Sequence, residues 1–152
     1  MEIEWLILAD AAQVVGGKLY LLGGGWNRYT VNTGFPTPHS MAIAMSVLVP
    51  WNETNERRAF EIEIATDDGD TVSKAKGQFE VGRPAGIPAG SDQRAQMAVT
   101  INWEIKRDGT FVVISRVEGA NERQFPFFVV PGPMLLAKRQ PTKEDNAAEE
   151  ST

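Results

Sequence analysis

The chain has 152 residues and 42% of them are hydrophobic, which predicts a single domain with a substantial core. Its formal net charge of −5 argues against general binding to nucleic-acid phosphates, which needs concentrated positive charge. Because cysteine is absent, disulfides, thiolate metal sites and cysteine nucleophiles are excluded; the absence fits a reducing compartment but is also tolerated outside one.

The first residues do not have the pattern of a targeting or membrane segment. Glu2 and Glu4 stand where a secretory signal would carry basic residues. The apolar run from Trp5 to Ala9 is too short to span a bilayer, which takes ~20 residues. We therefore expect a soluble, cytoplasmic protein without a membrane span.

Two strands are predicted near the start of the chain, over residues 3–14 and 18–31. The dipeptide Gly16-Gly17 lies between them and accepts the positive φ angles of a tight hairpin turn. Residues 23–25 are glycines, which predict a bulge, a bend or a close approach of another backbone. A phosphate loop is not indicated, because neither a Lys-Ser or Lys-Thr pair nor a helical pattern follows.

Three more strands are predicted in the middle of the chain. Residues 41–49 form a continuous apolar run, typical of a strand covered on both faces or of a sandwich core. Residues 60–64 alternate apolar and acidic side chains, as a half-buried strand does. The turn sequence Asp67-Asp68-Gly69-Asp70 leads into a strand over residues 71–81.

A proline- and glycine-rich segment separates these strands from the last three. Residues 82–90 have neither strand nor helix periodicity, which predicts a long exposed loop stiffened by its prolines. Strands are expected after it over residues 93–105, 111–117 and 124–130, which gives about eight strands and no helix.

The chain is predicted to end in a polar tail. The β-rich domain is assigned to residues 1–134, and residues 135–152 are assigned to a disordered segment. Such a polar segment buries too little apolar surface to offset the roughly 1–2 kcal/mol per residue that backbone ordering costs.

These elements predict an all-β fold, an immunoglobulin-like antiparallel β-sandwich of about eight strands, with a partly open β-barrel as the alternative. The segment Asp108-Gly109-Thr110-Phe111-Val112-Val113 resembles the start of the penultimate strand in immunoglobulin-like domains, where a glycine turn precedes a corner aromatic. Phe111 has no phenolic hydroxyl, so only the packing part of that motif is expected. Trp103 is expected to play a similar packing role.

Most of the chain also resembles a group of uncharacterised bacterial proteins of similar size, which form a domain family of unknown function. The resemblance is carried by MEIEWLILADAAQVVGGKLYLLGGGW, VPWNETN, GQFEVGRPAGIPAG and FPFFVVPGP. It implies a bacterial origin and a single-domain, β-rich protein. It implies no catalytic residue.

No catalytic residue is predicted. His39 is the only histidine, and its position between a proline-rich turn and a strand favours an ordinary surface or strand-edge residue. A catalytic triad of His39 with Ser40 or Ser115 has no support from the spacing, and neither serine lies in a Gly-x-Ser-x-Gly elbow.

No metal site and no cofactor is predicted either. The acidic turn at residues 67–70 offers oxygen ligands of the kind that calcium prefers, but it lacks EF-hand spacing, so a solvated hairpin turn is favoured. Glu61 and Glu63 share one strand face and are expected to form a solubilising outer surface.

A partner-binding surface is predicted around the loop at residues 82–90. Pairing of Arg83 with Asp92 to hold the loop closed is the favoured interpretation, and preorganisation of the loop for a partner is the alternative. Trp26 and Trp51 lie beside amide side chains and could stack on sugars or form protein hot spots, although capping the core is commoner. The candidate partner-binding residues are Arg83, Pro84, Ile87, Pro88, Asp92, Gln93, Arg94, Trp26 and Trp51.

By elimination, the sequence predicts a non-catalytic protein-interaction or structural module that acts through a sheet edge or the loop from Gly82 to Gln93, within a larger bacterial assembly. The alternative is a carbohydrate or small-ligand binder that uses Trp26 and Trp51 at one end of the sandwich. An enzyme built on Asp and Glu residues comes third. A protein partner is expected, general nucleic-acid binding is not, and a homo-oligomer is left open.

Overall fold

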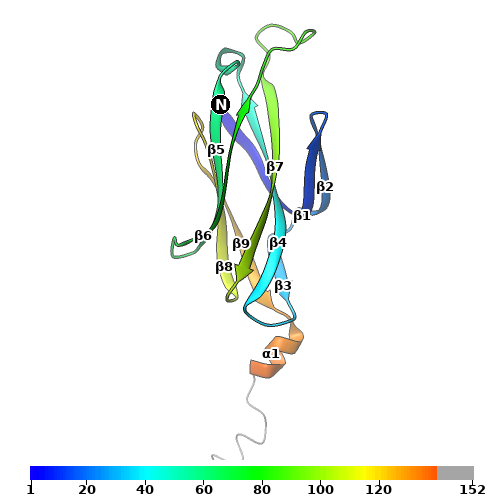
Figure 1. Cartoon of the computed structure of the whole chain (residues 1–152), viewed down its shortest axis with the longest axis vertical. Helices are drawn as coiled ribbons and strands as arrows, with labels where there is room; N and C mark the ends of the chain where they lie inside the picture. Colours follow the sequence, from blue (N-terminus) through cyan, green and yellow to red (C-terminus); the bar gives the residue numbers. More distant parts are fainter. Residues whose placement is uncertain (140–152) are drawn as a thin grey trace, which may run out of the picture.

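The computed structural model describes residues 1–139, which form two β-sheets around one core (Figure 1). The first sheet has the order β2-β1-β4-β7, and the second has the order β3-β9-β8-β5-β6. The all-β sandwich predicted from the sequence is confirmed, with nine strands in the described part of the chain. Their bounds are β1 Glu2–Val15, β2 Lys18–Gly24, β3 Arg28–Val31, β4 Thr37–Val49, β5 Arg57–Thr66, β6 Thr71–Glu80, β7 Gln93–Ile105, β8 Gly109–Val117 and β9 Arg123–Pro131.

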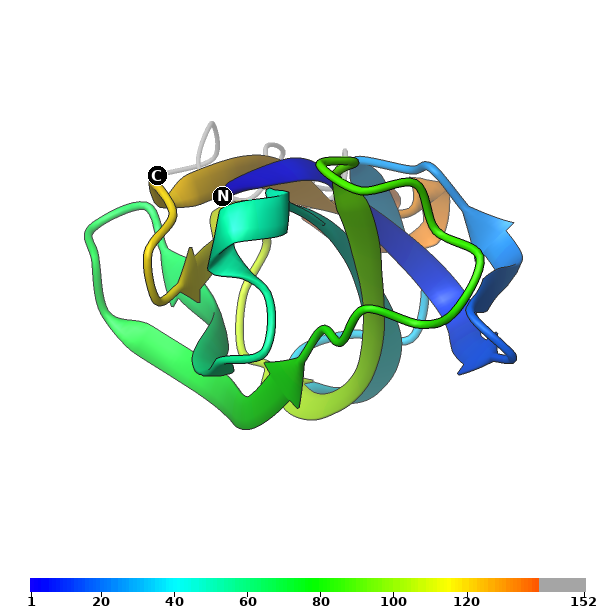
Figure 2. The ribbon, with the colours of Figure 1, turned by 90° about the horizontal axis from the view of Figure 1, so that it is seen from above.

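The two sheets curve around the core, and one of them approaches half a barrel (Figure 2). All neighbouring strands pair antiparallel except β3 and β9, which run parallel. The immunoglobulin-like character remains an interpretation of the sequence. None of the helices within residues 1–139 combines the length and the apolar character that crossing a membrane requires.

The core lies between the sheets and is built mainly from alternate residues of the strands, with no buried residue from β2. On β4 the inward residues from Met41 to Val49 are buried, and Ser115 Oγ of β8 donates a hydrogen bond of 2.7 Å to Met45 Sδ across the core. Each fully buried Val, Ile, Met or Phe side chain stabilises the fold by ~1.5–3 kcal/mol relative to its exposed state. The largest fully buried side chains are Phe127, Leu8, Met41, Ile43, Met45, Ile62, Ile64, Ile105, Val47, Val49, Val113 and Val129.

Three aromatic rings close one end of the core. Trp103 meets Phe111 edge-on at 5.2 Å between ring centroids and Phe127 at 6.1 Å, and Phe111 stacks on Phe127 at 5.7 Å. Such pairs contribute about 0.5–1.5 kcal/mol each beyond the area that they bury. Phe111 and Trp103 therefore have the packing roles expected from the sequence.

The prediction of a single strand over residues 18–31 is wrong, because this segment forms β2 in the first sheet and β3 in the second. The glycines at 23–25 make the bend between them: Gly23 and Gly25 have φ angles of 60° and 89°. Gly25 N donates to Leu8 O at 2.8 Å, and the Asp10 carboxylate lies where a side chain at Gly23 would stand. The expected bend and close approach are both present, and their effect is to carry the chain from one sheet to the other.

The prediction of no helix is also wrong. A single 3₁₀ turn, η1, spans Trp51–Glu53, and helix α1 spans Pro133–Arg139. Pro133 begins the helix, where its fixed φ is favourable and its missing N–H costs nothing, and Arg139 Nη2 lies 3.0 Å from Asp108 Oδ1. Seven residues are too few to show a helical period in the sequence. The predicted domain boundary at residue 134 thus falls inside a helix, and residues 140–152 of the predicted tail lie outside the described residues.

The second half of β1 and all of β2 form a hairpin, residues 9–24, that leaves the plane of β4 and lies beside the outer face of β7 (Figure 1). We call it the β1–β2 hairpin. Gly17 O in its turn accepts a hydrogen bond of 3.2 Å from Gln96 Nε2 of β7. On the outer face of β4, Ala42, Ala44 and Ser46 are fully buried. The predicted covering of residues 41–49 on both faces is therefore confirmed.

The contact between Phe60 and Gly77 provides a test of the second sheet. A Cβ at Gly77 would lie 2.5 Å from Phe60 Cζ, so we expect Gly77→Ala to lower the free energy of unfolding by about 1–3 kcal/mol. Gly82→Ala is the matched control, because the nearest heavy atom to its Cβ would be 3.9 Å away and its φ is not in the left-handed region. Urea denaturation of both variants measures the difference, and equal stability of the two would contradict the close contact between Phe60 and Gly77.

Candidate functional site

The candidate site is the loop that joins β6 to β7, residues 82–92, together with the side chains that hold it. The loop projects from one end of the molecule (Figure 1). Most of its residues are exposed, with Ile87 and Ser91 half-buried, so the predicted long exposed loop is confirmed. Two local turns order it: Ile87 N donates to Pro84 O at 3.4 Å, and Ser91 N donates to Pro88 O at 3.2 Å.

Arg83 fixes the first end of the loop. Its Nε donates to Thr54 Oγ1 at 2.7 Å and its Nη2 donates to Trp51 O at 2.7 Å. The guanidinium carbon also lies 4.3 Å from the centroid of the Trp51 ring, a cation–π arrangement. Arg83 therefore holds η1, and the favoured pairing of Arg83 with the exposed Asp92 is wrong.

The second end of the loop is held by Gln93 and Arg94. Gln93 Nε2 donates to Gly82 O at 2.6 Å, which ties the two ends of the loop together. Arg94 Nε donates to Glu4 Oε2 at 2.6 Å and Arg94 Nη2 donates to Glu4 Oε1 at 3.0 Å. Ser46 Oγ also donates to Glu4 Oε2, at 2.9 Å. The hydrogen bond from Arg94, followed by that from Ser46, lowers the pKa of Glu4 below its usual value.

The two predicted tryptophans lie at opposite ends of β4. Trp51 follows the last residue of β4, whereas Trp26 packs beside His39 near its first residue, with 6.5 Å between their ring centroids. Both rings are half-buried. The structure thus brings Trp51 to the loop, and a shared platform of Trp26 and Trp51 at one end of the sandwich is wrong.

His39 is half-buried among aromatic rings. Its ring centroid lies 3.9 Å from that of Tyr29 and 6.1 Å from that of Trp103. It lies where β4 pairs with β7 alone, so the strand-edge expectation holds, but its surroundings are not those of a surface residue. Burial lowers the pKa of His39, and the negative charge of Asp10 partly opposes this shift.

The serines named beside His39 do not form a triad with it. Ser115 is fully buried in the core, where it donates to Met45. Ser40 is exposed and pairs with Asn102 of β7. The structure therefore gives no geometric support to a catalytic triad of His39 with either serine.

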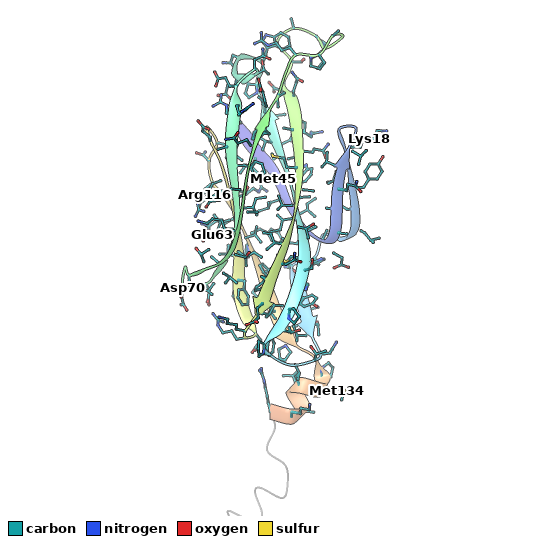
Figure 3. All side chains as sticks on the ribbon, viewed as in Figure 1. Lys18, Met45, Glu63, Asp70, Arg116 and Met134 are labelled. Atoms are coloured by element: carbon teal, nitrogen blue, oxygen red, sulfur yellow. The ribbon has the colours of Figure 1, made fainter. Side chains whose placement is uncertain are left out.

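Glu61 and Glu63 lie on the outer face of the second sheet, as expected, within an ordered ion-pair network. The solubilising role expected for both is wrong for Glu63, which is buried. Arg116 Nη1 lies 2.7 Å from Glu63 Oε2 and 3.2 Å from Glu61 Oε1, and Arg116 Nε lies 2.9 Å from Glu122 Oε2. Figure 3 shows Glu63 and Arg116 on this face. Thr71 Oγ1 also donates to Glu63, whose side chain is 7% exposed. Hydrogen bonds from Arg116 and Thr71 lower the pKa of Glu63.

The acidic segment at residues 67–70 is a hairpin turn between β5 and β6. Thr66 N donates to Asp70 O at 2.9 Å, and Gly69 N donates to Thr66 O at 3.0 Å. Arg107 Nη2 lies 3.4 Å from Asp67 Oδ1. The favoured hairpin turn is confirmed. Across residues 1–139, His, Cys, Asp and Glu side chains do not gather in groups of three that could hold a metal ion.

Three residues that hold the loop were missed by the sequence analysis, namely Glu4, Ser46 and Thr54. Glu4 is 90 positions from Arg94 and Thr54 is 29 positions from Arg83, so no local spacing links them. The available signal was weak: Thr54 follows Trp51 by three residues, the spacing at which its hydroxyl donates back to Trp51 O at 2.8 Å.

Comparison with known proteins gives a family for most of the chain. A model described as a family of unknown function, DUF6941, matches residues 4–130. No curated protein matches the chain.

Removal of the Arg83 contacts is expected to loosen the loop. In Arg83→Ala, the amides of Ile87 and Ser91 should exchange with deuterium faster, because the first end of the loop loses two charge-assisted hydrogen bonds and the stacking on Trp51. Arg83→Lys should restore little, since lysine lacks the planar fork. Arg28→Ala, at an exposed arginine of β3, is the control. Unchanged exchange in Arg83→Ala would show that the loop does not depend on this anchor.

The Glu63 network is expected to make stability depend on pH. The pKa of Glu63 is lowered in the folded protein, so its carboxylate stabilises the fold above the usual value near 4.5, and this is lost as the pH falls through the folded pKa. We expect Glu63→Gln to cost about 1 kcal/mol at neutral pH, because Arg116 is partly open to solvent.

Urea denaturation at neutral pH and at successively lower pH measures this cost. The difference between Glu63→Gln and the unmodified protein should shrink below pH 4.5, the usual value of the carboxyl group. Glu80→Gln, on the exposed face of β6, should show no such trend. A constant difference at every pH would argue against the ionised carboxylate as its source.

Proposed function

The chain belongs to the DUF6941 family of unknown function, and from that premise we propose that it is a non-catalytic protein-interaction module that binds through the loop at residues 82–92. One observation carries this proposal. Arg83 fastens the first end of the loop to η1, Gln93 ties the two ends together and Arg94 binds Glu4 at the second end, while most of the residues between them are exposed.

The fastening matters because a binding loop loses conformational entropy when it docks on a partner. Each rotamer-rich side chain that is immobilised in an interface costs ~0.5–1.5 kcal/mol, and ordering of backbone adds to this. Pro84 and Pro88 restrict the backbone, and the two local turns restrict it further. A loop that is ordered before binding avoids most of that cost.

The composition of the exposed surface also supports a protein partner. Pro84 and Pro88 present apolar rings, Ile87 contributes a half-buried aliphatic side chain, and Asp92 is charged and exposed. A mixture of apolar contacts with a polar rim is typical of protein interfaces. A role within a larger assembly in the bacterial cytoplasm belongs to this proposal as well.

Two other functions have less support. The carbohydrate alternative depended on a joint surface of Trp26 and Trp51, and these residues lie at opposite ends of β4. For an enzyme built on acidic residues, the candidates that share one partner are Glu61, Glu63 and Glu122. All three are engaged in ion pairs with Arg116.

The proposal is tested by replacing residues 84–91 with a Gly-Ser segment of equal length and comparing affinity purification from the native host. We expect one or more proteins to be recovered with the unmodified chain and lost with the variant. The control replaces Asp67 and Asp68 with Ser in the β5–β6 turn, at the other end of β5, and should retain them. Equal recovery with all three chains, or recovery with none of them, would overturn the proposal.

A further inference from the structure

The outward face of the β1–β2 hairpin carries exposed apolar side chains. Tyr20 is 57% exposed and Leu22 is 71% exposed, and because they are two residues apart they lie on the same face of β2. Val15, on the neighbouring strand, is also exposed. A contiguous exposed apolar surface on a folded domain is a signature of an interaction site.

The edge of this hairpin is also unprotected. β2 pairs with β1 on one side only, so within the described chain its other side presents unpaired backbone N–H and C=O groups. Exposed edges are normally blunted by charges or proline. Residues 11–24 contain neither proline nor any charge except that of Lys18, which lies at the tip of the hairpin (Figure 3). The edge is therefore suited to pairing with another strand.

We propose that the other strand is β2 of a second copy of this chain. Antiparallel pairing about a two-fold axis at Leu21 aligns all seven residues of β2, Lys18–Gly24, with those of the second copy. It places Tyr20 opposite Leu22 of the second copy, and Leu22 opposite Tyr20 of the second copy. Cross-strand pairs of an aromatic and an aliphatic side chain are stabilising, so the exposed surface is complementary to itself.

The charges at the two ends of the hairpin favour this antiparallel arrangement. Lys18 begins β2, whereas the carboxylate of Asp10 contacts Gly23 near the end of β2. Antiparallel pairing brings the Lys18 end of one copy to the Asp10 end of the other, twice in each dimer. Parallel pairing would instead bring the two Lys18 residues together, and like charges directly opposite one another are unfavourable.

Pairing also covers side chains that a single copy leaves open to water. Tyr20, Leu21 and Leu22, the residues nearest the two-fold axis, are 57%, 39% and 71% exposed in the single chain. In the pair each of them lies beside a side chain of the second copy, which removes part of this apolar surface from water.

This interface lies on a different surface from the loop at residues 82–92, so it does not depend on the proposed function. Pairing of two copies would extend the first sheet across the two-fold axis into one of eight strands, twice the four that each copy contributes. Two loops would then be presented by one particle, which increases the avidity for a partner with repeated sites.

Sedimentation velocity of the full chain over the micromolar concentration range tests the dimer. We expect the unmodified protein to dimerise and Leu22→Glu to raise the dissociation constant about tenfold, because it replaces the aliphatic partner in both cross-strand pairs of Tyr20 with Leu22 by a charged one. Met134→Glu is the matched control: Met134 is 70% exposed, nearly the same as Leu22, but lies on α1. It should leave the dissociation constant unchanged.

A charge exchange gives a second measurement that does not depend on Leu22→Glu remaining folded. Lys18→Asp and Asp10→Lys should each weaken dimerisation, and the double variant should recover it. The inference is overturned if the unmodified protein stays monomeric, if Leu22→Glu and Met134→Glu behave alike, or if the double exchange gives no recovery. A monomer that instead binds an extended peptide along β2 would also overturn it, since the edge would then belong to a different partner.

Discussion

The fold depends on the burial of β4 on both faces. Its inward side chains meet the second sheet, and its outward set, Ala42, Ala44 and Ser46, is equally inaccessible to water. A two-layer sandwich covers only one face of each strand, so a third layer is needed outside β4. The β1–β2 hairpin supplies part of that layer. The Glu4 side chain, which accepts hydrogen bonds from Ser46 and Arg94, supplies another part. The small outward residues let these groups approach closely.

The same constraint explains which parts of the fold could be predicted from the sequence. The uninterrupted apolar run at residues 41–49 predicts burial of β4 on both faces, and the alternation at residues 60–64 predicts burial of β5 on one face. Turn glycines located most strand ends. The prediction of one strand over residues 18–31 failed, because glycines allow both a bend within a strand and a bend that carries the chain from one sheet to the other. Only the distant β9 decides between them, through its pairing with β3.

The candidate site was predictable as a loop but not as an anchored loop. Proline and glycine content showed that residues 82–90 are exposed, and the loop ends were correctly suspected of holding it. The partners were misassigned because Arg83 and Asp92 are neighbours in sequence, whereas Thr54 and Trp51 are neighbours of Arg83 in space. The contacts of Glu63 could not be predicted from the local sequence for the same reason, because Arg116 and Thr71, which contact it, lie on two different strands.

The parallel pairing of β3 with β9 has a consequence for the order of assembly. Arg28 is in register with Phe128, and Asn27 O accepts a hydrogen bond from Phe128 N at 2.8 Å, so these contacts close a loop of about a hundred residues. While the chain leaves the ribosome, the first sheet and the β5–β6 hairpin have all their strands before β9 exists. The edge of the second sheet can be completed only after β9 has left the ribosome, and until then Val31, which is buried in the folded protein, has no strand beside it.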